Sequence, residues 1–293
     1  MNKTILITGA TGQQGNSVIR HLQGKGFKLR GLTRHPEKAE SLEKLGVEAV
    51  QGDLTDRSSL GKVFQGVQRL LLVVTPYEAG TESETVQGIN AVEAANDAGV
   101  EYIYYSSVGS AHRDTGIPHF ESKRKIEERI FETGLKYTIL RPVFFMDNFS
   151  APWMLPALQQ GTLNLPVKPD RPLAMVAVDD VGAYAAAALA NPDKFASEEI
   201  EFAGEELTLP QALAAVSKFT GAKIGYNQMS YDDSEKYFGH DFAVMFKWFN
   251  DVGYNPNIPE LKKKYSIPVT NFDDYLKTVS WIKNFKAAPV PKM

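Results

Sequence analysis

Residues 5–15 read ILITGATGQQG, and this stretch decides the fold of the chain. An apolar run typical of a strand leads into glycines at positions 9, 12 and 15, and a helical pattern follows. Glycines at this spacing let the chain turn tightly, let the backbone approach a phosphate, and let the helix lie close to the strand. Free N–H groups at the helix start then face that phosphate. The stretch predicts a dinucleotide site rather than a purely structural turn, formed by Gly9, Ala10, Thr11, Gly12, Gln13, Gln14 and Gly15.

The end of the second predicted strand indicates which dinucleotide binds. An NAD-binding turn carries Asp or Glu there for the ribose 2′-hydroxyl, whereas a cation accommodates a 2′-phosphate. This strand end has no acid, and Arg34 follows it with Lys38 close behind. A guanidinium can bind a phosphate through two parallel hydrogen bonds. The sequence therefore favours NADP(H), the alternative being that both cations are solvated surface charges.

Composition is that of an enzyme-sized globular protein: 293 residues, 43% hydrophobic and 23% charged, with a formal net charge of -3. That charge predicts no direct binding to nucleic acid or to an anionic membrane. The chain has no cysteine and its five histidines are scattered, so we expect neither a disulfide nor a metal site. It begins without a signal-peptide pattern, and apolar stretches such as residues 183–190 are too short to span a bilayer. The predicted location is cytoplasmic.

Short apolar runs alternate with helical patterns along the first half of the chain. Strands are predicted at residues 4–8, 28–33, 48–51, 69–74, 102–106 and 136–140, and helices at 14–25, 37–45, 58–64, 81–98 and 121–132. This alternation predicts an α/β fold, a doubly wound parallel Rossmann sheet, with a smaller and mostly helical C-terminal lobe for the substrate. We expect an NADP(H)-binding domain at residues 1–150, with a return segment near 174–190, and the smaller lobe at 151–293.

The carboxyl ends of the predicted strands are where such a fold binds its ligand. Asp53 follows the third strand and can accept from the exocyclic amine of an adenine, whereas Asp56 fits better as the cap of the next helix. Thr75 and Pro76 end the fourth strand and expose backbone beside the cofactor. The fifth strand ends in Ser106, whose hydroxyl is expected near the nicotinamide or a substrate carbonyl.

The glycine spacing resembles that of the extended and atypical short-chain dehydrogenases/reductases. Within that superfamily the chain resembles the NmrA-like family, through blocks at residues 8–15, 33–36, 52–54, 119–123 and 140–148, and more loosely at 176–182 and 230–251. The resemblance implies that Leu54, Phe145 and Asn148 also bind the cofactor. The family includes isoflavone-reductase-like enzymes, quinone reductases, and regulators that bind NADP without known catalysis.

The superfamily's proton donor is a tyrosine one helical turn before a lysine, and here His119 holds the tyrosine position before Lys123. Tyr104 and Tyr105 lie on the fifth predicted strand and are interpreted as packing residues. Lys123 either binds the cofactor ribose, the interpretation we favour, or acts as a general acid/base, as the isoflavone-reductase-like branch implies. His119 either donates a proton or packs at the start of a helix.

Aromatic residues gather after the sixth predicted strand, among them Phe144, Phe149 and Trp153. They are typical of a flat apolar pocket for a quinone-like ligand, or of ordinary core filling. Two functions follow as hypotheses. The first is an NADPH-dependent reductase of a small, flat, apolar substrate such as a quinone. The second is a non-catalytic NADP(H) redox sensor that binds a protein partner.

Overall fold

The computed structural model describes residues 3–265, 267 and 269–288, and these form two compact units. The first unit contains the chain up to Pro142 together with Val178–Glu201. The second unit contains Val143–Ala177 and the chain from Phe202 onward. Residues 143–150, expected in the first domain, therefore belong to the second unit.

A parallel sheet organises the first unit. Among the described residues, seven strands follow the order β10-β6-β5-β4-β1-β2-β3, and the pairs formed by β1 to β6 are parallel. Their bounds are β1 Thr4–Ile7, β2 Lys28–Thr33, β3 Glu48–Gln51, β4 Arg69–Leu72, β5 Tyr102–Ser106, β6 Lys136–Pro142 and β10 Glu198–Phe202. The predicted doubly wound α/β class is confirmed.

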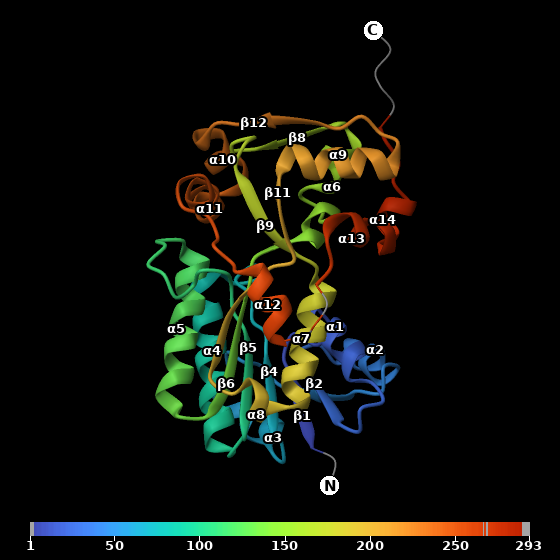
Figure 1. Ribbon diagram of the computed structural model, residues 1–293. Helices are drawn as coiled ribbons and strands as arrows, with labels where there is room; N and C mark the ends of the chain where they lie inside the picture. Colours follow the sequence, from blue (N-terminus) through green and yellow to red (C-terminus); the bar gives the residue numbers. More distant parts are fainter. Residues whose placement is uncertain (1–2, 266, 268, 289–293) are drawn as a thin grey trace. The chain divides into compact units, whose positions relative to one another are not determined.

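Helices cover both faces of this sheet. Helices α4 and α5 pack together on one face, and α1 and α7 pack together on the other (Figure 1). The helices are α1 Gln13–Leu22, α2 Ala39–Glu43, α3 Leu60–Phe64, α4 Gly80–Asp97, α5 Pro118–Thr133, α7 Val178–Ala190 and α8 Pro192–Phe195, with 3-10 turns η1 Pro36–Lys38 and η2 Arg57–Ser59. The strands β1, β4 and β5 are buried along their whole length, as expected for a sheet covered on both faces.

The strand order reverses between β1 and β4. From β1 the chain continues to β2 and β3 on one side, and then returns to place β4 on the other side of β1. In a doubly wound sheet the crevice at this reversal, beyond the carboxyl ends of the strands, is where ligands bind. The phosphate-binding turn follows β1 directly, so the topology places it at this crevice.

Several predicted boundaries were wrong by a few residues, and local chemistry explains them. β4 ends at Leu72 rather than at 74 because Val73 bonds a side chain: the Thr8 hydroxyl donates to its carbonyl at 2.8 Å and accepts from its N–H at 2.7 Å. α1 ends at Leu22 rather than at 25, since Gly24 takes a left-handed φ of 73°. The helix predicted over 37–45 is divided into η1 and a short α2.

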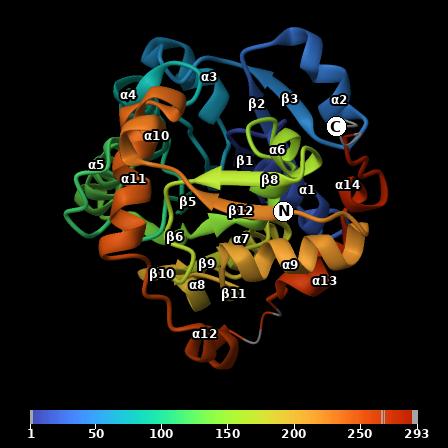
Figure 2. The ribbon, with the colours of Figure 1, turned by 90° about the horizontal axis from the view of Figure 1, so that it is seen from above.

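The second unit is mixed. In its described part, β7 Phe144–Phe145, β9 Pro172–Val176 and β11 Glu205–Thr208 form one small sheet, and β8 Thr162–Leu165 pairs with β12 Gly225–Gln228. Figure 2 shows β8 and β12 side by side, with α9 near them. The helical segments are η3 Met146–Ser150, α6 Leu155–Gln159, α9 Leu209–Thr220, α10 Tyr231–Phe238, α11 His240–Asp251, α12 Ile258–Tyr265, α13 Phe272–Thr278 and α14 Ser280–Lys283.

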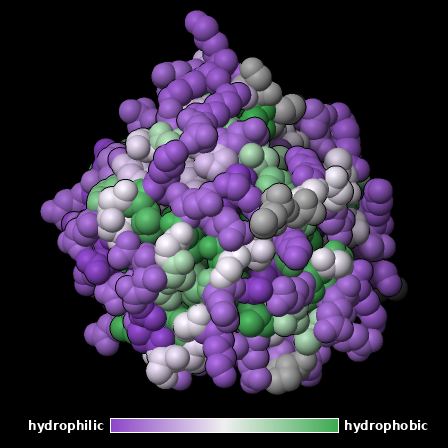
Figure 3. All heavy atoms as spheres, turned by 90° about the horizontal axis from the view of Figure 1, so that it is seen from below, coloured by the Kyte–Doolittle hydropathy of each residue, from purple (hydrophilic) through white to green (hydrophobic). Residues whose placement is uncertain are grey.

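Polar side chains dominate the face shown in Figure 3, where apolar residues form small areas between them. Within the described ranges, every helix is too short or too polar to cross a membrane.

Candidate functional site

The turn between β1 and α1 has the geometry of an anion cradle. Gly9 adopts a left-handed φ of 61°, and the N–H of Gly12 donates to the carbonyl of Gly9 at 2.9 Å. A Cβ on Gly15 would lie 2.3 Å from that same carbonyl oxygen, so the helix can approach the strand only with glycine there. Among the described side chains none caps α1 at Gly12, and its first turn holds no acid. The N–H groups at the start of α1 are therefore suited to a phosphate.

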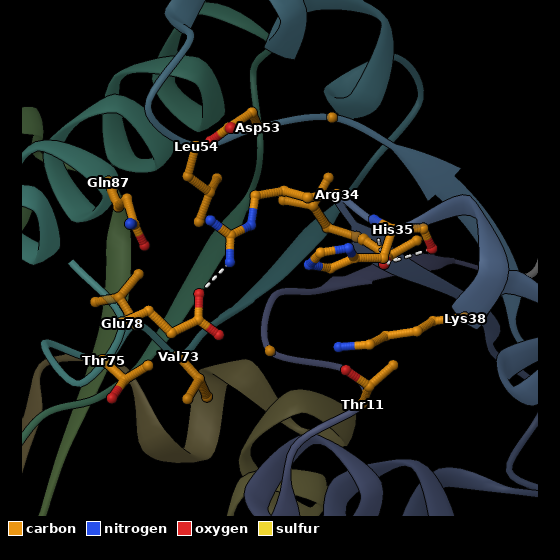
Figure 4. A pocket seen from close by; sticks show the side chains of 15 residues that line it. Thr11, Arg34, His35, Lys38, Asp53, Leu54, Val73, Thr75, Glu78 and Gln87 are labelled. Atoms are coloured by element: carbon orange, nitrogen blue, oxygen red, sulfur yellow. Dashed lines mark hydrogen bonds and ion pairs between the residues drawn. The ribbon is translucent and has the colours of Figure 1, made fainter.

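A pocket opens beside this turn, and the residues that line it follow four different strands. Thr11 comes from the turn after β1, Arg34 from the end of β2, Asp53 from the end of β3 and Thr75 from the end of β4 (Figure 4). The sheet topology thus brings predicted cofactor-binding residues that are spread between positions 9 and 75 to the same pocket. All of the lining lies in the first unit.

Both predicted phosphate-binding cations reach this pocket, but only one of them has an ion-pair partner in the described part of the chain. Lys38 points toward Thr11, and it has no ion-pair partner among the described residues (Figure 4). The Arg34 guanidinium instead crosses the pocket and pairs with the Glu78 carboxylate. Glu78 lies in the loop between β4 and α4. Sequence reasoning missed it, because it searched for an acid only at the end of β2.

Asp53 lines the pocket and also shapes its own loop. One carboxylate oxygen accepts from both the N–H and the hydroxyl of Thr55, each at 2.8 Å. Leu54 lies next to it, with its carbonyl fixed by the Asn90 amide at 2.8 Å. Asp56 caps η2 through the Ser58 N–H at 3.0 Å, which confirms the role expected for it. Hydrogen bonds from Ser58 hold the pKa of Asp56 below its ordinary value.

Polar links join the phosphate turn to the neighbouring strand ends. The Ser106 hydroxyl, at the end of β5, donates to the Gln14 side-chain oxygen at 2.6 Å. Thr75 lines the pocket, and the carbonyl of Pro76 accepts from the N–H of Gly80 at 2.7 Å. These contacts fix the loop after β4 against the start of α4, while Gln14 ties α1 to β5.

Lys123 is buried in a polar cluster that the sequence did not reveal. Its ammonium donates to Glu84 Oε1 at 2.7 Å and to the carbonyl of Val74, a pocket-lining residue, at 3.1 Å. Glu84 is entirely buried on α4, and its other oxygen accepts from the Ser122 hydroxyl. An ammonium has three donors, and these partners use two of them. The pattern of α4 alone gives no sign that Glu84 faces inward.

The tyrosine and histidine side chains that the sequence offered as proton donors are packed. Tyr104 and Tyr105 are fully buried on β5, and burial raises the pKa of each phenol well above its ordinary value. They are thus core residues, as the packing interpretation predicts. His119 is buried at the start of α5 and makes an edge-to-face contact with Phe120, their ring centres 4.8 Å apart.

Phe145 and Asn148 lie in the second unit, in β7 and η3. Their contact with the cofactor remains a prediction. The nearby aromatic residues pack within that unit. The ring centres of Phe149 and Phe272 are 4.9 Å apart, and those of Trp153 and Phe238 are 6.1 Å apart. Phe149 is fully buried, as expected of core filling. In the described part of the chain no cluster of three or more potential metal ligands occurs.

The doubly wound sheet, the glycine turn and the cation-bearing pocket at the strand reversal define a Rossmann-type dinucleotide-binding protein. The chain belongs to the NmrA-like family, whose family model matches residues 1–279. The resemblance inferred from the sequence blocks is confirmed.

One relative and one solved structure that are similar to the chain are quinone oxidoreductases. Quinone oxidoreductase 2 of Escherichia coli is 32% identical over 233 residues, which cover 78% of this chain and 79% of the relative. An Escherichia coli NADPH-dependent quinone oxidoreductase, solved with NADPH, is similar with a TM-score of 0.78 and 28% identity, over 92% of this chain and 98% of that one.

Two further solved structures share the fold. The triphenylmethane reductase of Citrobacter sp., complexed with NADP(H), has a TM-score of 0.81 and 24% identity, over 94% of this chain and 100% of that one. NmrA, a negative transcriptional regulator solved with NADP, has a TM-score of 0.76 and 23% identity, over 96% of both chains.

Proposed function

We propose that the first unit binds NADP(H). The observation that carries this is that the glycine turn, which leads into the uncapped start of α1, meets Arg34 and Lys38 at one pocket. In this arrangement the N–H groups of α1 bind the pyrophosphate, and the two cations bind the 2′-phosphate. The relative solved with NADPH supports the same cofactor.

We further propose that the protein is a reductase of a small, flat, apolar substrate such as a quinone, and that the second unit provides the substrate side. Bound NADPH would supply the hydride. Lys123 uses its remaining N–H to hold the nicotinamide ribose, because Glu84 and Val74 already fix the ammonium. The proton comes from solvent or from Lys123. The name of the 32% identical relative, a quinone oxidoreductase, supports this substrate class.

A regulatory role is the second candidate. It is favoured by the position of His119, buried where a catalytic tyrosine would be exposed to substrate, and by a Lys123 ammonium already paired with Glu84. An assay of NADPH oxidation with a panel of quinones and enals separates the two functions. Steady turnover of any of them supports the reductase. Tight NADPH binding without turnover across the panel would contradict it and favour the regulator.

Replacing Arg34 tests the cofactor preference. We expect Arg34→Ala to weaken NADP(H) binding by about 1.5–3 kcal/mol, roughly ten- to a hundredfold, because a charge-assisted phosphate contact is lost. NAD(H) has no 2′-phosphate, so its affinity should change little. Lys44→Ala is a matched control, since Lys44 is an exposed cation paired with Glu40 on α2. Calorimetric titration with both cofactors checks this, and an equal loss for both would contradict it.

A further inference from the structure

The pair between Arg34 and Glu78 occupies the guanidinium that the proposed function assigns to the 2′-phosphate. Both residues line the same pocket, and Figure 4 shows Arg34 extended across it toward the carboxylate. A carboxylate and a phosphate use the same fork of guanidinium donors. The two anions therefore compete for one cation.

The pair is also easily broken. The Arg34 side chain is 40% exposed and that of Glu78 is 62% exposed, so water screens their attraction and can solvate either group after separation. Glu78 lies outside the strands. It follows Tyr77, whose N–H donates to the Thr75 hydroxyl, and it lies within the turn closed by the hydrogen bond from the Gly80 N–H to the Pro76 carbonyl. A change of its side-chain rotamer is enough to release Arg34. If the carboxylate stayed in place, it would repel an arriving phosphate.

We propose that Glu78 is a specificity-determining residue that lowers the affinity for NADP(H) by competing with the 2′-phosphate for Arg34. The inference rests on the proposed binding of NADP(H) at this pocket. NAD(H) carries a hydroxyl in place of that phosphate, so it leaves the pair of Arg34 and Glu78 intact and meets no competition. Arg34 and Lys38 make NADP(H) bind more tightly than NAD(H). Glu78 reduces this difference in affinity.

Neutralising Glu78 tests the competition. Glu78→Gln should tighten NADPH binding about two- to fivefold, the range expected for an exposed ion pair, and leave NADH binding unchanged. The gain should shrink at high salt. Glu82→Gln is the matched control, because Glu82 is an exposed acid in the first turn of α4 that does not line the pocket. An equal gain from both variants would overturn the proposal, since it would show a general effect of net charge.

A double variant shows whether the effect passes through Arg34. In the Arg34→Ala background, Glu78→Gln should lose its gain for NADPH, because no guanidinium remains to be released. An undiminished gain there would overturn the proposal. A second pattern would also overturn the proposal. In it the wild type prefers NADPH and Arg34→Ala loses that preference, but Glu78→Gln binds both cofactors as the wild type does. That result leaves the proposed function standing. A wild type that binds neither cofactor would overturn both.

Discussion

Gly12→Val is expected to abolish binding of either cofactor while leaving the fold intact. Gly12 has an ordinary φ of -85°, and a Cβ there would meet one atom, the carbonyl oxygen of Gly9, at 3.2 Å. A valine can therefore be built with a small shift of the turn. Its branches would fill the space through which a pyrophosphate approaches the N–H groups of α1. Losing two charge-assisted hydrogen bonds costs about 3 kcal/mol or more, over about a hundredfold in affinity.

The measurement is a cofactor titration beside circular dichroism of the same samples. Gly61→Val is the matched control, because Gly61 lies on α3 and a Cβ there meets nothing within 4 Å. Gly15 is not a usable position, since its Cβ would lie 2.3 Å from the Gly9 carbonyl oxygen and would separate α1 from β1. A folded Gly12→Val protein with native affinity would exclude the turn as the pyrophosphate site.

Lys123→Met is expected to have the largest effect on stability. It would leave the fully buried Glu84 without its cation, and an uncompensated buried charge typically costs about 3–5 kcal/mol. Adding Glu84→Gln should recover much of this loss, because a neutral amide keeps the hydrogen bond with Ser122. Urea unfolding of the wild type, both single variants and the double variant measures the coupling. Additive losses would show that the pair does not act as a unit.

The same double variant distinguishes the two roles of Lys123. If the ammonium holds the ribose, NADPH binding weakens and turnover at saturating cofactor stays near that of Glu84→Gln, because the interaction is made equally in the ground and transition states. That is the outcome we expect. A proton donor would instead cost about 10²–10⁴ in saturated turnover and remove one limb of the pH profile. Native NADPH affinity with no saturated turnover would contradict the ribose role.

Local sequence signals predicted most of the first unit. The bounds of β2, β3 and β5 match the prediction, because a polar or glycine-containing turn closes each of these runs. Asp56 was correctly assigned as a cap from its distance to the next helix. By contrast, β10 was not predicted. It is mostly glutamate, and it is held at the edge of the sheet by contacts such as that of Glu199 with Arg141 at 2.7 Å.

The residues that sequence reasoning missed at the site are acids brought in from elsewhere in the chain. Glu84 is buried because α5 supplies both Ser122 and Lys123 to it, and neither partner is near it in sequence. Glu78 reaches Arg34 because β4 and β2 are both neighbours of β1 in the sheet. Inspecting each strand end separately therefore finds cations such as Arg34, but not the carboxylates that pair with them in the folded chain.

We propose that this pocket binds the adenosine half of NADP(H) through its 2′-phosphate. The most direct test is a calorimetric titration of the wild-type protein with NADPH and with NADH at the same ionic strength. We expect NADPH to bind about tenfold more tightly, because one charge-assisted phosphate contact favours it by roughly ten- to a hundredfold and competition from Glu78 removes about two- to fivefold of that gain. Equal affinities for the two cofactors, or a preference for NADH, would contradict the account.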